Sequence, residues 1–120
     1  MKRFAYFIPA LLWAALTFYL SSRSTTPDII GEIPFGDKIV HATYYGIFTL
    51  WVLYGARWPD NRMAWWCVLP VSLYGMTDEY HQSFVPGRSS DWRDWVADTT
   101  GAVLCVLIWR YISQKKRSAP

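Results

Sequence analysis

The feature that most restricts the fold is a run of 19 residues without a charge, from Phe4 to Ser22. As a helix rising 1.5 Å per residue, this run would cross roughly 30 Å of hydrocarbon. Residues 1–3 form a short basic start, as they would in a cleaved signal peptide. The run is long and bulky, however, and no A-x-A cleavage site follows it. We therefore predict an uncleaved membrane-spanning helix over residues 4–22.

Three further apolar stretches predict three more spans, over residues about 37–56, 63–80 and 93–112. Hydrophobic residues make up 52% of the 120 residues and aromatic residues 18%, which is more apolar material than a soluble core of this size needs. We expect an all-α, polytopic membrane protein, in which residues 1–120 form one domain built as a bundle of four transmembrane helices. Asp37 is placed to cap the second span, while Pro9 and Pro70 lie inside the first and third.

The segments between the spans have the composition of loops. Residues 23–36 carry two Pro and two Gly, residues 57–62 form a tight basic turn, and residues 81–90 contain the turn pair Pro86-Gly87. Cys67 and Cys105 lie in apolar stretches and are interpreted as buried small hydrophobes rather than as metal ligands or a disulfide.

The distribution of basic residues predicts the orientation. With four spans, one side of the membrane receives eight of the twelve Lys and Arg residues, and the other side receives four together with eight of the nine acids. Short loops rich in Lys and Arg stay in the cytoplasm, so both termini are expected to be cytoplasmic. The basic residues expected on the cytoplasmic side are Lys2, Arg3, Arg57, Arg62, Arg110, Lys115, Lys116 and Arg117.

The basic residues are clustered beside apolar runs rather than along one soluble face, which argues against nucleic acid as a partner.

Helical spacing places polar residues on one face of each of three spans. At 100° per residue, the second span aligns Asp37, His41, Tyr44 and Phe48; the third aligns Ser72, Gly75, Glu79 and Gln82; the fourth aligns Asp91, Asp94, Asp98, Ala102 and Cys105. Ionisable side chains are costly in hydrocarbon and usually face the interior of a bundle. We therefore expect these faces to meet in an extracytoplasmic pocket, with Arg88 on the loop above.

A structural role for the same charges is the simplest alternative. Ion pairs of Arg88 or Arg93 with the acids, and of Lys38 with Asp37, could pin the helices together, although packing through small residues usually suffices. Asp28, Glu32 and Arg23 suit a wet surface loop. His81 would point about 160° away from Glu79 in a continuing helix, and is interpreted as an interfacial histidine.

The polar residues resemble those of the VanZ-like family of small membrane proteins. The resemblance covers nearly the whole chain and rests on the following elements: Asp37-Lys38 with His41 and Tyr45, the motif Glu79-x-x-Gln82-x-Phe84-x-Pro86-Gly87-Arg88, Asp94, and Gly101 near Asp98. The end of the first span, Phe-Tyr-Leu-Ser-Ser, also fits. The position of Asp98 is commonly Asn in this family, so its polarity rather than its charge could be what counts.

The resemblance implies a role at the cell envelope, because the family's namesake is associated with low-level resistance to the glycopeptide teicoplanin. We expect a multi-pass protein of the bacterial cytoplasmic (inner) membrane that acts on, or binds, a lipid-linked or envelope substrate with an anionic headgroup. The expected partners are membrane lipids and a lipid-linked envelope precursor or a glycopeptide, and an oligomer would be compatible. The candidate catalytic groups are His41, Glu79, Asp94 and Asp98. The candidate substrate-binding groups are Asp37, Lys38, Tyr45, Gln82 and Arg88.

The reaction class stays open at this level. His41 or Glu79 could act as general acid or base, and Arg88 with Lys38 could hold a phosphate. No nucleophile elbow, zinc spacing or Gly-rich phosphate loop is present. We assign no metal ligand, although carboxylates from two helices with His41 could instead bind a divalent cation. A non-catalytic binding or transport module, or a structural partner of envelope-assembly machinery, remains the alternative to an enzyme.

Overall fold

The computed structural model describes residues 3–24, 30 and 32–119. Within these ranges the regular structure is entirely helical, so the all-α prediction is confirmed for them. Two of the helices begin with a short 3-10 segment, and the central part of the 23–36 loop, including Asp28, lies outside the described residues, as does Lys2. The elements are η1 (Phe4–Phe7), α1 (Ile8–Ser21), α3 (Gly36–Gly55), η2 (Met63–Cys67), α4 (Val68–Gln82) and α5 (Trp92–Ser118).

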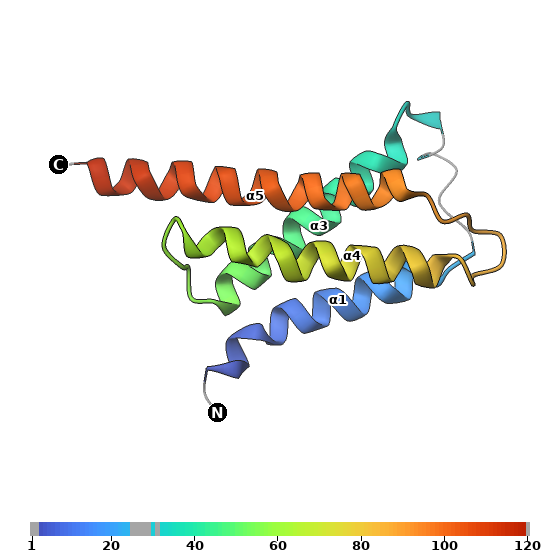
Figure 1. Cartoon of the computed structure of the whole chain (residues 1–120), viewed down its shortest axis with the longest axis horizontal. Helices are drawn as coiled ribbons and strands as arrows, with labels where there is room; N and C mark the ends of the chain where they lie inside the picture. The colour runs from blue at the N-terminus through green and yellow to red at the C-terminus, as the bar shows by residue number, and fades with distance from the viewer. Residues whose placement is uncertain (1–2, 25–29, 31, 120) are drawn as a thin grey trace.

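The four α-helices form a bundle in which α4 lies between α1 and α5, and α3 crosses behind them at a steep angle (Figure 1). The start of η1, the turn between α3 and η2 and the end of α5 lie toward one end of the molecule. The end of α1, the start of α3 and the loop from α4 to α5 lie toward the other. The predicted polar clusters therefore gather at a single end.

Both internal prolines lie in the first turn of an α-helix rather than in its interior. Pro9 is the second residue of α1 and Pro70 the third residue of α4, each directly after a 3-10 segment. The N–H groups of a first turn have no partner within the helix, so proline removes no hydrogen bond there. Both prolines lie inside the predicted spans, and within each span the helix changes from 3-10 to α just before the proline.

Three predictions about the helix ends need correction. α3 begins at Gly36, its N-cap is Phe35 and no side chain caps it, so the prediction that Asp37 caps this helix is wrong. α4 continues through His81 and Gln82 instead of ending at Tyr80. α5 continues through the basic tail to Ser118, because Gln, Lys and Arg are good helix formers and cations are favourable near a helix C-terminus.

The closest approach between helices is the crossing of α3 and α5. A Cβ added to Gly101 would lie 2.0 Å from the carbonyl oxygen of Ala42, so a side chain at this position would force the two backbones apart. Small residues allow this kind of approach between helices in membranes. One core cluster surrounds Tyr45, Phe48 and Val71, and a second surrounds Leu53 and Val106.

Two helical stretches, Phe4–Ser21 and Trp92–Ser118, are long and apolar enough to cross a membrane by length and composition. Large hydrophobic side chains are exposed along these stretches, among them Leu11, Leu12 and Ile108. Exposed apolar surface of this extent is expected where a helix contacts lipid rather than water.

Candidate functional site

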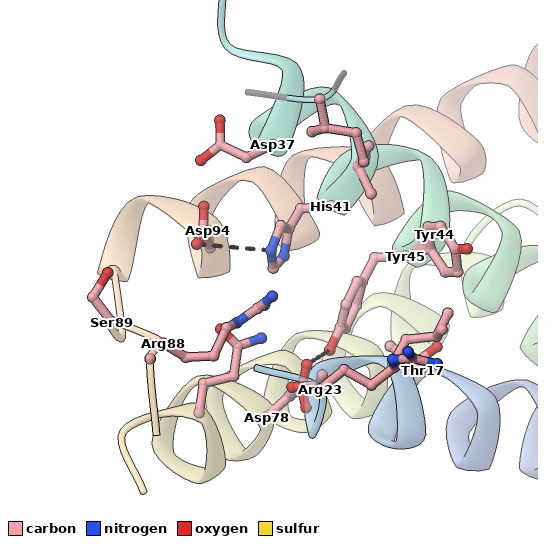
Figure 2. Close-up of a pocket in the computed structure, with 16 residues that line it drawn as sticks. Thr17, Arg23, Asp37, His41, Tyr44, Tyr45, Asp78, Arg88, Ser89 and Asp94 are labelled. Atoms are coloured by element: carbon pink, nitrogen blue, oxygen red, sulfur yellow. Dashed lines mark hydrogen bonds and ion pairs between the residues drawn. The ribbon is translucent and has the colours of Figure 1, made fainter. Parts of the chain in front are cut away.

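A pocket of about 900 Å³ opens at the end of the bundle where the polar clusters gather (Figure 2). Its wall is built from the last turn of α1, the first three turns of α3, the last turns of α4, the loop that precedes α5 and the first turn of α5. The lining residues are Thr17, Leu20, Ser21, Arg23, Ile30, Asp37, Val40, His41, Tyr44, Tyr45, Asp78, Gln82, Gly87, Arg88, Ser89 and Asp94.

His41 stands between two aspartates of α5. Its Nδ1 lies 2.8 Å from Oδ1 of Asp98, which is fully buried. Its Nε2 lies 3.7 Å from Oδ2 of Asp94 (Figure 2). Asp94 and Asp98 are four residues apart on α5, so their carboxylates project from the same face, one turn from each other. This face of α5 was predicted from the spacing of its acidic residues. In the structure its two carboxylates face the imidazole of His41 on α3.

Lys38 points to α5 rather than into the pocket. Its Nζ lies 2.8 Å from Oδ2 of Asp37 and 3.1 Å from Oδ2 of Asp91, and it also contacts Oδ1 of Asp94. One ammonium group thus faces three carboxylates and ties the start of α3 to the start of α5. The side chain of Asp91 also accepts a hydrogen bond from the backbone N–H of Arg93, 2.9 Å away, and thereby caps α5. This N–H and the nearby Lys38 lower the pKa of Asp91 from its ordinary value.

Glu79 of α4 is 6% exposed, and its carboxylate accepts hydrogen bonds from residues just before α5. Its Oε2 accepts a hydrogen bond from the backbone N–H of Asp91 at 3.1 Å and a longer one from the hydroxyl of Ser90 at 3.5 Å. Its Oε1 has no partner among the described residues, and the same is true of Oδ2 of Asp98. Glu79, Asp98 and His41 each offer one ligand atom, and these atoms lie within 4.8 Å of one another.

Tyr45 is buried and donates a hydrogen bond to Oδ2 of Asp78, 3.2 Å away (Figure 2). Gln82 is buried one turn further along α4 and lines the same pocket. Asp78 was missed by the sequence analysis, which followed the stripe through Glu79. The spacing Val71, Gly75, Asp78, Gln82 would also have indicated it, because these residues share a helical face as well.

Two arginines line the pocket from opposite sides. Arg88 is half-buried on the loop before α5, and Arg23 is exposed just after α1. Neither guanidinium group forms an ion pair within the described part of the chain. Arg23 was predicted to lie on a wet loop, and its position at the pocket depends on how α1 packs, which its neighbours in sequence do not reveal.

The remaining predicted residues are placed less centrally. Asp37 lines the pocket but is exposed. Lys38 does not line the pocket, so the structure does not bring it beside Arg88 as an anion ligand. His81 faces α1, where its Nε2 lies 2.9 Å from the hydroxyl of Ser22 and its ring stacks on Phe18.

These features define an all-helical protein with two helices apolar enough to cross a membrane and a polar pocket at one end of its bundle. A family model described as VanZ/LLP1 matches residues 4–113, which is most of the chain. The chain belongs to the VanZ/LLP1 family, and the resemblance noted from its motifs is confirmed. No curated protein and no solved structure matches it.

Proposed function

We propose that this protein is a multi-pass membrane protein whose pocket binds the anionic headgroup of a lipid-linked substrate of the cell envelope. The observation that carries the proposal is the pair Arg23 and Arg88, which line the pocket without ion-pair partners among the described residues. A guanidinium group presents a fork of N–H donors that matches two oxygens of a phosphate or carboxylate. Substrate binding would supply the missing partners.

The surroundings of the pocket support a lipid as the carrier of the headgroup. Phe18, Tyr80 and Phe84 lie next to the pocket end of α1 and α4 and are exposed. A substrate with its charge in the pocket could therefore keep its hydrocarbon chain against apolar surface. A soluble anion would gain nothing from this surface.

The proposed topology has four spans with both termini in the cytoplasm. The basic turn after α3 and the basic end of α5 lie at the end of the bundle away from the pocket (Figure 1). Cytoplasmic loops of membrane proteins carry an excess of Lys and Arg, so the pocket would open on the extracytoplasmic side of the bacterial inner membrane. α4 has only 15 residues, or about 22 Å of helix, and η2 would complete its span.

The chemistry at the pocket could extend from binding to catalysis. His41 lines the pocket and could exchange a proton with a bound headgroup, while Asp94 would orient His41. Glu79 does not line the pocket, so it could act as acid or base only on a headgroup that reaches past the lining residues. Lys38 is already occupied by three carboxylates and is assigned a structural role, in line with the alternative that some charges only pin helices together. A link to teicoplanin resistance, implied by the family resemblance, would follow from headgroup binding at the outer face.

The test is a binding measurement on the full-length protein in lipid nanodiscs, with a long-chain prenyl phosphate as probe and the prenyl alcohol of equal length as comparison. We expect the phosphate to bind more tightly than the alcohol. Substitution Arg88→Gln should weaken phosphate binding by about tenfold or more, since hydrogen bonds to charged groups contribute about 1.5–3 kcal/mol. Phosphate release from the same samples would distinguish an enzyme from a binding module.

The matched control is Arg93→Gln, which removes a cation at the same end of the bundle. Arg93 is outside this pocket and its side chain is largely exposed, so its loss changes the general attraction for anions but not the pocket. Equal binding of the phosphate and the alcohol, or equal losses in the two variants, would contradict the proposal.

A further inference from the structure

Three groups able to bind a metal meet where α3, α4 and α5 converge. His41, Glu79 and Asp98 come from three different helices, and one ligand atom of each lies within 4.8 Å of the other two. Glu79 is 6% exposed and Asp98 0%, so both carboxylates are removed from water. Such a convergence depends on the packing of three helices and is not a local cluster on one of them.

The two carboxylates are incompletely satisfied by the protein. Oε1 of Glu79 and Oδ2 of Asp98 are buried and have no hydrogen-bond partner within the described ranges. Lys38 pairs with Asp37, Asp91 and Asp94, and its contacts do not include these two groups. A buried oxygen without a partner costs about 1–3 kcal/mol, and more for a charged group. Folded proteins retain few such oxygens, and a bound ion is one way to supply the missing partner.

We propose that His41, Glu79 and Asp98 bind one divalent cation of the Zn²⁺ or Mn²⁺ type. One imidazole with two carboxylates suits these ions better than Mg²⁺ or Ca²⁺, which prefer oxygen ligands alone. The cation would pair with both unsatisfied oxygens and balance the two negative charges. It would also replace the proton shared between Nδ1 of His41 and Oδ1 of Asp98, which are 2.8 Å apart, and that proton would be released to solvent.

Asp94 is suited to support this site without being one of its ligands. Its Oδ2 faces Nε2 of His41 at 3.7 Å, on the side of the ring away from Asp98. Carboxylates in this position commonly fix the orientation of a metal-binding imidazole. Three protein ligands would leave a coordination position for water or for a substrate oxygen, as in catalytic zinc sites.

The inference goes beyond the proposed binding of a headgroup and does not depend on it, because the cation can be measured without any lipid substrate. The purified full-length protein in detergent is stripped with a chelator, equilibrated with Zn²⁺ alone or Mn²⁺ alone, and freed of unbound metal. Metal content per chain is then determined, and X-ray absorption of the zinc sample reports the ligand types. We expect about one cation per chain in at least one of the two series, and one imidazole with oxygen ligands around zinc.

The variants Glu79→Gln and Asp98→Asn should retain less than about a tenth of the wild-type metal at the same free concentration, in the range found when groups around a metal are altered. Asp78→Asn is the matched control. Asp78 precedes Glu79 in the chain, is 3% exposed and also carries an unsatisfied oxygen. It accepts a hydrogen bond from Tyr45, however, and is not one of the three proposed metal ligands. The Asp78→Asn variant should keep the wild-type content.

Two outcomes would overturn the inference. One is a wild-type protein that retains neither ion, and the other is equal metal in all four proteins. If a variant fails to fold, the absorption spectrum of the wild-type zinc sample still decides, since an environment without imidazole excludes His41 as a ligand.

Discussion

A Cβ placed on Gly75 of α4 would lie 2.9 Å from Oδ2 of Asp98 on α5, so the absence of a side chain at one residue makes room for the carboxylate of the other. The same added atom would lie 3.2 Å from a ring carbon of Tyr45. Gly75 therefore determines how closely α4 can approach the buried groups of the pocket.

The substitution Gly75→Ala should destabilise the protein by about 1–3 kcal/mol, the usual cost of overpacking a filled core. Unfolding in mixed micelles with increasing SDS would measure it. Gly46→Ala is the control, because its Cβ would meet only backbone atoms of Gly101, the oxygen at 3.4 Å and the carbonyl carbon at 3.8 Å, which are ordinary contacts. Equal stability of the two variants would show that the space beside Asp98 is not tightly filled.

The substitution Tyr45→Phe removes the hydroxyl that donates to Asp78 and leaves that buried carboxylate without its tyrosine partner. We expect a loss of about 1–3 kcal/mol, the cost of a buried acceptor left unsatisfied. The neighbouring change Tyr44→Phe should have little effect, because no hydrogen bond of the Tyr44 hydroxyl occurs within the described residues. The same SDS titration compares them, and a larger loss for Tyr44→Phe would contradict the assignment.

Lys38→Met should destabilise the start of α3 and α5, because Asp37, Asp91 and Asp94 would lose their shared cation. We expect about 2 kcal/mol, less than the 3–5 kcal/mol typical of a fully buried pair, because the side chain of Lys38 is 22% exposed. Lys115→Met on the exposed end of α5 serves as control and should change stability little. If both variants unfold at the same SDS fraction as the wild type, the three-carboxylate contact contributes nothing measurable.

The lowered pKa of Asp91 predicts how its contribution depends on pH. A carboxyl group with a lower pKa in the folded state stabilises the protein fully above its unfolded pKa of about 3.9, and this contribution is lost as the pH falls through the folded-state pKa. The melting temperature of Asp91→Ala should therefore lie below that of the wild type by a constant amount from pH 5 to 8, and the difference should shrink below pH 4.

The variant Asp91→Asn separates the two contacts of this residue. Its side-chain oxygen can still accept the hydrogen bond from the N–H of Arg93, but it has no charge for Lys38. Its melting temperature should lie between those of the wild type and the alanine variant. A wild-type advantage over alanine that persists unchanged below pH 3 would contradict the role assigned to the charge.

The helical face of α5 could be predicted from the sequence because its polar residues recur every three to four positions. Asp94, Asp98 and Ala102 are indeed buried on one side of that helix. On α3, Asp37 and His41 share one helical face and Lys38 lies on another. That Lys38 contacts α5 is decided by the packing of the two helices and could not be predicted from spacing. The position of Arg23 depends on contacts between distant segments, which periodicity along one helix cannot indicate. Asp78 could have been predicted, because it shares a helical face with Gly75 and Gln82.

The most direct test of the account is to determine which side of the membrane the pocket faces. Ser89 is exposed on the pocket wall, and Ser118 is exposed at the far end of α5. In intact bacterial cells a membrane-impermeant maleimide should label Ser89→Cys, whereas Ser118→Cys should react only after the cells are permeabilised. The wild-type protein with Cys67 and Cys105 gives the background. Labelling of Ser118→Cys but not Ser89→Cys in intact cells would place the pocket in the cytoplasm and contradict the account.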